Sequence, residues 1–282
     1  MQESPVTLKS LLFTLLVSIF VLLIVFIFQF TDSRTKIVFC DVGQGDAAYI
    51  RIRNQIDLLI DAGPDHKVLQ CLGKYMPFWD REIELAFITH EDLDHYGGFI
   101  HIIDRYRVGK LISVDYKNAG KSYQRLEQKA KSKRIPLEFY FTGDKIRILD
   151  SYILFFWPPE GLKTADDNEY SLVFLFQEKN FKLLFTGDSS PKALQKLTRL
   201  NTKKDLFRLK NVDILKVPHH GSCLGLTSSF LKLADPEVAV ISVGLDNSYG
   251  HPRKQILDLL EAQNIEIKRT DKNGDIKFIL EE

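Results

Sequence analysis

Apolar residues occupy positions 11 to 30 almost without interruption, since only Thr14, Ser18 and Gln29 break the run and none is charged. An α-helix needs about 20 such residues to cross a bilayer core. A secretory signal peptide would have a shorter apolar region, with small residues at a cleavage site after it. The pattern predicts an uncleaved, single-pass transmembrane helix over residues 11–30, between an N-terminal flank (1–10) and a linker (31–35). The flanking charges leave open which side of the membrane the remaining chain faces.

Short apolar runs fill the rest of the chain, residues 36–282, which we interpret as one domain. Seven of these runs have the length and the flanking turn residues of buried strands: 36–40, 47–53, 55–60, 85–88, 181–185, 212–217 and 238–243. Longer patterns at 68–75, 99–106, 122–133, 191–200 and 254–262 predict helices. Hairpin-like pairs alternate with strand–helix–strand crossovers, which indicates two sheets flanked by helices.

The densest polar motif is the sequence THEDLDHYGG at residues 89–98, which follows the apolar run at 85–88. Within six residues it contains His90, Asp92, Asp94 and His95. Such a cluster is costly to bury unless it binds a metal ion. The alternative is a polar surface loop with two incidental histidines. The other motifs favour a metal site, because acids or histidines beside glycines also follow predicted strands at Asp61, Asp188, His219–His220 and His251.

These motifs predict a centre for one or two divalent metal ions. Asp188 is expected to bridge, because one carboxylate can span two ions about 3.5–4 Å apart. A water held between the ions would ionise near neutral pH and become the nucleophile. Adjacent strand residues point in opposite directions, so His219 and His220 remain alternatives for one ligand position. The predicted ligands are His90 and Asp92 for the first ion, Asp94 and His95 for the second, Asp188 between them, and His219 or His220.

Charge and cysteine content change this picture only slightly. The net charge of the 282 residues is +1, but residues 104–147 hold twelve Lys and Arg against five Asp and Glu, and residues 192–216 hold eight against two. Such stretches are solvated helix faces or surfaces that attract a polyanion. The three cysteines, Cys40, Cys71 and Cys223, are odd in number and far apart. We therefore expect buried thiols and no disulfide framework.

From about residue 36 to its end, the chain resembles the metallo-β-lactamase-fold domain of ComEC-type DNA-internalisation competence proteins. The matching motifs appear in the expected order: DVGQGD (41–46), IDAG (60–63), THEDLDHYGG (89–98), Asn168 with Ser171, FTGD (185–188), VPHHGS (217–222), ISVG (241–244) with NSYGHP (247–252), and RTDKNG (269–274). The resemblance implies an α+β fold, a four-layer αββα sandwich with metals between its sheets. It also implies a metal-dependent hydrolase that acts on phosphodiesters, with DNA as a partner.

Two positions depart from the general superfamily pattern, HxHxDH. Asp92 replaces the second histidine, as it does in the ComEC-like branch, and an oxygen ligand should favour Mn²⁺ or Mg²⁺ relative to a histidine-rich Zn²⁺ site. Asn168 or a neighbour stands where the superfamily has a separate histidine, so one ion is expected to bind tightly and one loosely. ComEC proteins also carry many membrane spans, whereas one is predicted here. A separate membrane channel protein is therefore an expected partner.

Several other residues are candidates for substrate contacts. Gln44 and Asp46 are expected at the pocket rim, although a tight glycine turn would explain them equally well. Ser222, Asn247 and Tyr249 are further candidates for substrate binding. His251 is expected either to donate a proton to the leaving group or hold a phosphate, or to cap a loop. Asp61 is expected to orient a ligand histidine rather than to bind metal.

The sequence thus favours a membrane-anchored, metal-dependent phosphodiesterase or nuclease, with Asp94, Asp188 and His251 as catalytic residues. Its cofactor would be one or two divalent ions, Zn²⁺ or Mn²⁺ and also Mg²⁺. The first alternative keeps the hydrolase but directs it to a cell-envelope phosphoester, such as choline phosphate or a lipid head group. The second alternative is a non-catalytic module that binds DNA or a partner protein in an uptake apparatus.

Overall fold

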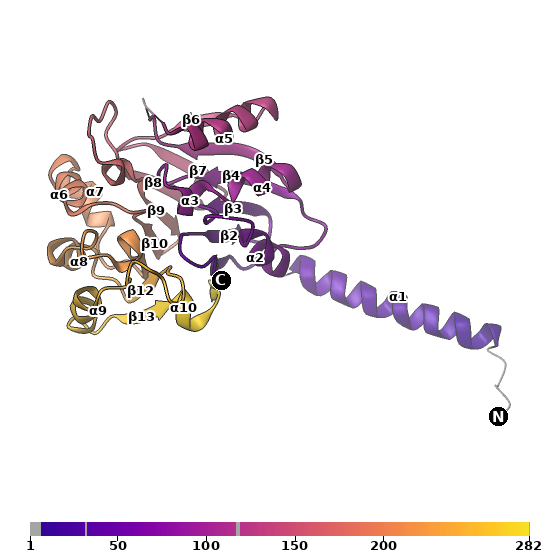
Figure 1. Cartoon of the computed structure of the whole chain (residues 1–282). Coiled ribbons are helices and arrows are strands. Elements are labelled where there is room, and N and C mark those ends of the chain that lie inside the picture. Colours follow the sequence, from indigo (N-terminus) through magenta and orange to yellow (C-terminus); the bar gives the residue numbers. More distant parts are fainter. Residues whose placement is uncertain (1–6, 32, 117–118, 282) are drawn as a thin grey trace.

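Two seven-stranded sheets form the body of the protein, whose computed structural model describes residues 7–31, 33–116 and 119–281 (Figure 1). The first sheet has the order β14 (Ile276–Ile279), β1 (Lys36–Phe39), β2 (Ala48–Ile52), β3 (Ile56–Ile60), β4 (Glu82–Phe87), β5 (Arg107–Ser113) and β6 (Leu137–Phe139). The second has the order β13 (Glu266–Arg269), β12 (Val238–Ile241), β11 (Ile214–Lys216), β10 (Phe181–Phe185), β9 (Val173–Glu178), β8 (Ser151–Trp157) and β7 (Lys145–Ile148).

Both sheets are mixed, and each changes its pairing at one strand. The first is antiparallel from β14 to β3 and parallel from β3 to β6. The second is antiparallel from β7 to β10 and parallel from β10 to β13. Asp61 follows β3 and Asp188 follows β10. The carboxyl ends of neighbouring parallel strands share one sheet edge, which is where α/β folds place ligands.

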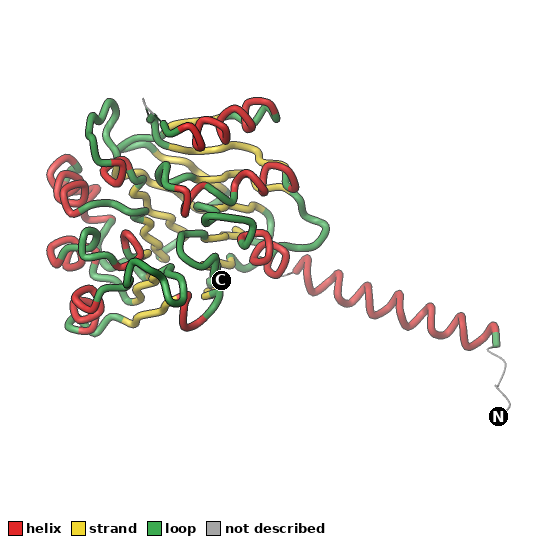
Figure 2. The backbone as a smooth tube through the Cα atoms, in the orientation of Figure 1, coloured by secondary structure: helices red, strands yellow, loops and turns green. Residues whose placement is uncertain are grey.

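Helices cover the outer face of each sheet, so the molecule has four layers (Figure 2). The first sheet is covered by α2 (Val68–Tyr75), α3 (Leu93–Tyr96), α4 (Phe99–Arg105) and α5 (Lys121–Ser132). The second is covered by α6 (Pro191–Leu200), α7 (Lys203–Arg208), α8 (Ser228–Ala234) and α9 (Lys254–Glu261). The short elements η1 (Asp167–Tyr170), η2 (Pro218–Gly221) and α10 (Thr270–Asn273) lie in the connections. The predicted αββα layering is confirmed.

The core between the sheets is aromatic. Phe87 of β4 stacks on Phe174 of β9 with ring centroids 5.2 Å apart, and Phe174 stacks on Phe185 of β10 at 5.0 Å. These side chains are buried, and β4 and β10 are the strands that lead into the THEDLDH and FTGD motifs. Close packing of their rings therefore fixes how far apart the two motifs stand.

Helix α1 (Leu8–Thr31) extends away from the sheets (Figure 1), and its apolar side chains from Leu11 to Ile24 are exposed. Among the described residues, no helix combines the length and the apolar character that a membrane crossing needs. The predicted single-pass membrane anchor over residues 11–30 is therefore wrong. Residues 1–6 of the predicted flank and residue 32 of the predicted linker lie outside the described part.

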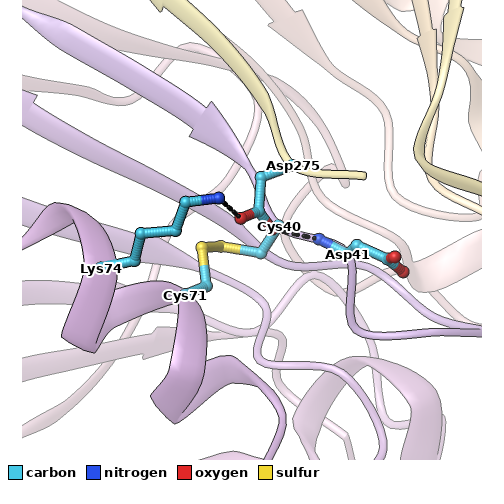
Figure 3. Close-up of a disulfide and its surroundings, with 5 residues drawn as sticks. All are labelled: Cys40, Asp41, Cys71, Lys74 and Asp275. Carbon is cyan, nitrogen blue, oxygen red and sulfur yellow. Dashed lines mark hydrogen bonds and ion pairs between the residues drawn. A yellow bond between two sulfur atoms is a disulfide. The ribbon is translucent and has the colours of Figure 1, made fainter. Parts of the chain in front are cut away.

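A disulfide joins Cys40 to Cys71, with their Cα atoms 5.8 Å apart (Figure 3). Cys40 directly follows β1, and Cys71 lies on the buried face of α2, which packs against the same sheet. The expectation of three unpaired, buried thiols is therefore wrong, because sequence spacing does not reveal which cysteines meet in space. Cys223 is free and exposed. Beside the bridge, Asp275 accepts hydrogen bonds from the Asp41 backbone N–H and from Lys74, at 3.0 and 2.9 Å.

Candidate metal centre

Asp61 holds the beginning of the THEDLDH loop in place. Its carboxylate accepts hydrogen bonds from the backbone N–H and the hydroxyl of Thr89, at 2.8 and 2.7 Å. Its own N–H donates to the carbonyl oxygen of Phe87 at 2.8 Å. Asp61 adopts a φ of 54°, a left-handed conformation that non-glycine residues adopt mainly where the surroundings enforce it. The end of β3 is thus tied to the motif that follows β4.

His95 and His220 are each held by one ring nitrogen so that the other is free. His95 Nδ1 lies 2.9 Å from a carboxylate oxygen of Asp61, and His220 Nδ1 lies 2.9 Å from the backbone oxygen of Ser242. Both partners accept hydrogen bonds, so each Nδ1 is a donor, and each Nε2 carries a lone pair when the ring is neutral, as it is in a metal ligand. Neither Nε2 has a hydrogen-bond partner within the described structure, although both are buried.

His90 presents a third unpaired nitrogen to the same space. Its Nδ1 lies 3.1 Å from the Thr89 hydroxyl, and its buried Nε2 has no hydrogen-bond partner among the described residues. That Nε2 lies 3.4 Å from a carboxylate oxygen of Asp92. On the other side, a carboxylate oxygen of Asp94 lies 3.2 Å from His220 Nε2. Asp92 and Asp94 are 49% and 32% exposed, so the cluster opens to solvent on their side.

Asp188 lies at the middle of these side chains. Its carboxylate oxygens lie 3.3 Å from the Nε2 atoms of both His95 and His220, and 4.0 Å from His90 Nε2. The preceding Gly187 has a φ of 48°, and a Cβ there would meet Thr89 at 3.0 Å. Glycine therefore allows the β10 turn to approach the THEDLDH loop closely enough for Asp188 to enter the cluster.

The donor set fits a divalent cation. His90, His95 and Asp188 form one group of side chains whose ligand atoms lie within 4.8 Å of one another, and Asp94, His95 and His220 form another. Imidazole nitrogens and carboxylate oxygens are the ligands of Zn²⁺ and of related ions. Three buried nitrogens without hydrogen bonds are otherwise costly, and an ion would satisfy them.

The electrostatics support the same interpretation. Burial alone would lower the pKa of His95, but the Asp188 and Asp61 carboxylates outweigh it and raise the pKa well above its usual value. His220 behaves likewise, with Asp188 and Asp46 raising its pKa. Burial opposes the ionisation of Asp188, yet the two histidines hold its pKa well below the ordinary value. The anionic cluster therefore attracts positive charge, which protons supply until a metal ion displaces them.

The structure distinguishes the two neighbouring histidines geometrically. His219 and His220 both have a φ of 52° within η2, so the strand-like alternation assumed from the sequence does not apply. His220 is buried inside the cluster, whereas His219 is 23% exposed and its Nε2 lies 3.8 Å from an Asp188 oxygen. The buried Oδ1 of Asn168 has no hydrogen-bond partner among the described residues.

The predicted substrate residues lie in loops beside the cluster. Gln44 Oε1 accepts a hydrogen bond from the Gly244 N–H at 3.3 Å, and the Ser222 hydroxyl accepts one from the Leu224 N–H at 3.2 Å. Both groups of the Asn247 amide are engaged within its loop, with the backbone of Gly244 and His251. These three residues thus shape the loops around the site.

Tyr249 and His251 lie at the edge of the cluster. Their rings are nearly parallel, 11° apart, with centroids separated by 5.9 Å, and His251 also meets His219 at 6.0 Å. Tyr249 is 61% exposed. Burial, followed by the charges of His220 and His219, lowers the pKa of His251 to about 4. His251 is therefore neutral near pH 7, which makes it a hydrogen-bonding group more than a source of protons.

The sequence analysis missed Lys216, which is buried at the end of β11 and pairs with Asp46. Asp46 itself is buried behind the histidines, not at the pocket rim where it was expected. The signal for Lys216 was a lysine inside the apolar run at 212–217, beside the histidine motif. A lysine in such a strand is rarely buried without a partner.

Comparison with known proteins places these motifs in a family. The chain is 26% identical over 277 residues to ComE operon protein 3 of Bacillus subtilis, and the match covers 92% of this chain and 34% of that protein. It is 27% identical over 252 residues to competence protein ComA of Neisseria gonorrhoeae, covering 88% of this chain and 32% of that protein. The chain thus spans about a third of the length of these relatives. The predicted resemblance to ComEC-type competence proteins is confirmed.

Solved structures give the same fold. The metallo-beta-lactamase fold protein YhfI from Bacillus subtilis superposes with a TM-score of 0.59 at 13% identity, over 88% of this chain and all of that one. The model of the metallo-beta-lactamase superfamily matches residues 40–244, a span that begins at the bridged Cys40 and includes His90, Asp188 and His220. The chain therefore belongs to the metallo-beta-lactamase superfamily.

Proposed function

We propose that this chain is a metal-dependent hydrolase that cleaves phosphodiester bonds, with nucleic acid as its substrate. One observation carries the proposal: three buried Nε2 atoms, from His90, His95 and His220, surround the Asp188 carboxylate and have no hydrogen-bond partner in the described part of the chain. When bound, one or two divalent ions would supply a Lewis acid and a water whose pKa is low enough to attack a phosphorus atom.

Different residues of the chain have different roles at that centre. His90, His95 and Asp188 would hold one ion, and Asp94 and His220, whose ligand atoms lie 3.2 Å apart beside Asp188, are placed to hold a second. Asp61 and the Ser242 carbonyl keep the rings of His95 and His220 turned so that Nε2 faces the ion. The half-exposed Asp92 marks the side from which substrate reaches the centre.

Two basic helices begin next to the centre, which supports a polyanionic substrate. The Gly120 N–H, which precedes α5, donates to the Glu91 carboxylate of the THEDLDH loop at 3.2 Å. Lys121, Arg125 and Lys129 then follow along α5. On the other side, α6 begins three residues after Asp188 and contains Arg199 as well as Lys192 and Lys196, which share the Glu169 carboxylate. Lysine and arginine arranged in this way contact successive phosphates of a nucleic-acid strand.

The relationship to competence proteins supports DNA as the substrate and a role linked to DNA uptake. The chain spans about a third of those relatives, and a membrane channel protein belongs to the proposal as a partner. The relatives do not identify the native ion, and the carboxylates of Asp92 and Asp94 favour Mn²⁺ or Mg²⁺ over a histidine-rich Zn²⁺ site.

The test uses the full chain, stripped of metal and then supplied with Mn²⁺, Zn²⁺ or Mg²⁺. Cleavage of single- and double-stranded DNA and of bis-(p-nitrophenyl) phosphate is measured beside Asp188→Asn and a control, Asp258→Asn, on the exposed Lys254–Asp258 pair. Metal-dependent DNA cleavage that disappears only in Asp188→Asn supports the proposal. Cleavage of the small ester alone would redirect the enzyme to an envelope phosphoester. Metal and DNA binding without turnover would contradict a hydrolase.

A further inference from the structure

We propose that Lys216 is a positioning residue of the metal centre, which holds Asp46 behind His220 and keeps this carboxylate from acting as a ligand itself. The inference rests on the metal centre proposed above, but it does not depend on which substrate is hydrolysed. It concerns a buried ion pair that lies on the inner side of the histidines, away from solvent.

Lys216 occupies a position where an ammonium group needs a fixed partner. It is the last residue of β11, between the parallel strands β10 and β12, and its side chain is 3% exposed. Its Nζ lies 2.5 Å from an oxygen of Asp46 and 3.0 Å from the carbonyl oxygen of Val217. An ammonium buried in this way is stable only when such acceptors surround it.

Asp46 connects this ammonium to the ligand loops. Its backbone N–H donates to the Asp94 carbonyl oxygen at 3.1 Å, and its own carbonyl accepts from the Gly63 N–H at 2.8 Å. One carboxylate oxygen lies 3.2 Å from His220 Nδ1, and the other lies 3.9 Å from His95 Nδ1. Asp46 therefore stands at the Nδ1 side of both rings, opposite the Nε2 atoms that face Asp188.

Asp46 would be a competing ligand if it were free to move. Its carboxylate oxygen, Asp188 and His220 also form a group whose ligand atoms lie within 4.8 Å of one another. The Lys216 ammonium pairs with the second carboxylate oxygen of Asp46. The first oxygen of Asp46 therefore remains directed at His220. The ammonium thereby keeps Asp46 fixed behind the His220 ring, whose Nδ1 is held by the Ser242 carbonyl oxygen, and such groups behind metal ligands commonly support their positions.

The balance of charges at the centre also supports a positioning role for Lys216. Five carboxylates lie within 4 Å of the histidines of the cluster, and one lysine ammonium lies among them: Asp46, Asp61, Asp92, Asp94, Asp188 and Lys216. The ammonium lowers the net negative charge of this group by one, whether one ion or two are bound. Without Lys216, the centre would carry one more negative charge beside the buried Asp46, which low-dielectric surroundings disfavour.

The test compares Lys216→Met, Asp46→Asn and the double variant in the full chain. Metal affinity is measured by chelator competition with Zn²⁺, and the visible absorption spectrum of the Co²⁺-loaded protein reports ligand geometry. Lys216→Met is expected to weaken metal binding 10- to 100-fold and to change the Co²⁺ spectrum. The control, Lys210→Met, removes an exposed lysine of the same basic stretch and is expected to change neither.

The double variant separates positioning from simple loss of stability. The neutral amide introduced by Asp46→Asn needs no cation to balance it. The double variant is therefore expected to bind metal at least as tightly as Lys216→Met. Thermal unfolding in EDTA shows whether each variant folds. If Lys216→Met does not fold, Asp46→Asn, which retains the lysine, must show the altered Co²⁺ spectrum.

The positioning role would be overturned if Lys216→Met kept the metal affinity and the Co²⁺ spectrum of the wild type. It would also be overturned if the losses of metal affinity in the two single variants simply added in the double variant. A wild-type chain that binds no metal would instead refute the proposed centre. A wild-type chain that binds metal but hydrolyses nothing would refute the proposed function and leave the role of Lys216 standing. The three failures are therefore distinguishable.

Discussion

Replacing Cys40 and Cys71 together by alanine is expected to lower the free energy of unfolding by about 3.7 kcal/mol. The disulfide separates its cysteines by 31 residues, and the estimate is the loop-closure entropy that a link of this length removes from the unfolded chain at 25 °C. The closed loop contains the DVGQGD motif, β2, β3 and Asp61. Next to the disulfide, Asp275, which directly precedes β14, accepts hydrogen bonds from the Asp41 N–H and from Lys74 (Figure 3). Loss of the bridge thus removes a constraint on the strands that support the centre.

The assay is chemical denaturation of the full chain in EDTA, so that bound metal does not contribute to stability. All proteins carry Cys223→Ala, which removes the exposed thiol and its side reactions. A reducing agent should bring the parent protein to the stability of the double variant and leave the variant unchanged. The reasoning is refuted if the two proteins differ by less than about 1 kcal/mol, or if reduction has no effect on the parent.

Three further predictions concern the centre and its surroundings. Asp61→Ala leaves two donors of Thr89 and the His95 Nδ1–H without an acceptor. The free energy of unfolding, measured by denaturation, should fall by about 2–4 kcal/mol. Metal affinity, measured by chelator competition, should fall by about 10- to 100-fold. Metal at 100 times its dissociation constant should stabilise the fold by about 2.7 kcal/mol, and EDTA should reverse the rise in melting temperature. The pKa of His251 falls to about 4 in the folded protein. The stabilising contribution of His251 is therefore present above pH 6.5 and is lost as the pH falls toward 4. His251→Gln should lose less thermal stability than the parent between pH 7 and pH 4.5, measured in EDTA.

Each of these predictions has a clear contrary result. A metal affinity unchanged in Asp61→Ala would mean that the orientation of His95 does not matter for the centre. If metal does not change the melting temperature, the ion does not bind the native state in preference to the unfolded chain, which would contradict the prediction. Equal acid sensitivity of His251→Gln and its parent would show that His251 keeps an ordinary pKa in the folded protein.

The layered fold and the cluster were predictable because their signals are local. Each strand that carries a motif is a short apolar run, and a polar motif at its end points to a sheet edge whatever the distant packing is. The residues His90, Asp92, Asp94 and His95 come together for this reason. Asp188 joins them because Gly187 permits the close approach that its motif suggested.

The remaining features depend on packing between distant segments. The choice between His219 and His220 rested on strand alternation, but both residues take left-handed backbone angles. The pairing of Cys40 with Cys71 follows from how α2 docks on the first sheet. Lys216 resembled a solvated residue of a basic stretch until the fold placed it against Asp46. The run at 11–30 suggested a membrane span, which no helix within the described residues provides.

Metal stoichiometry tests the account most directly, because every other claim about the site depends on a bound ion. The full chain is dialysed to equilibrium against Zn²⁺ or Mn²⁺, and the bound metal is counted by elemental analysis beside Asp188→Asn and His220→Gln. The account predicts one or two ions per chain in the wild type and fewer in both variants. A wild-type chain without bound metal, or variants that retain the same number of ions, would contradict the metal centre around Asp188.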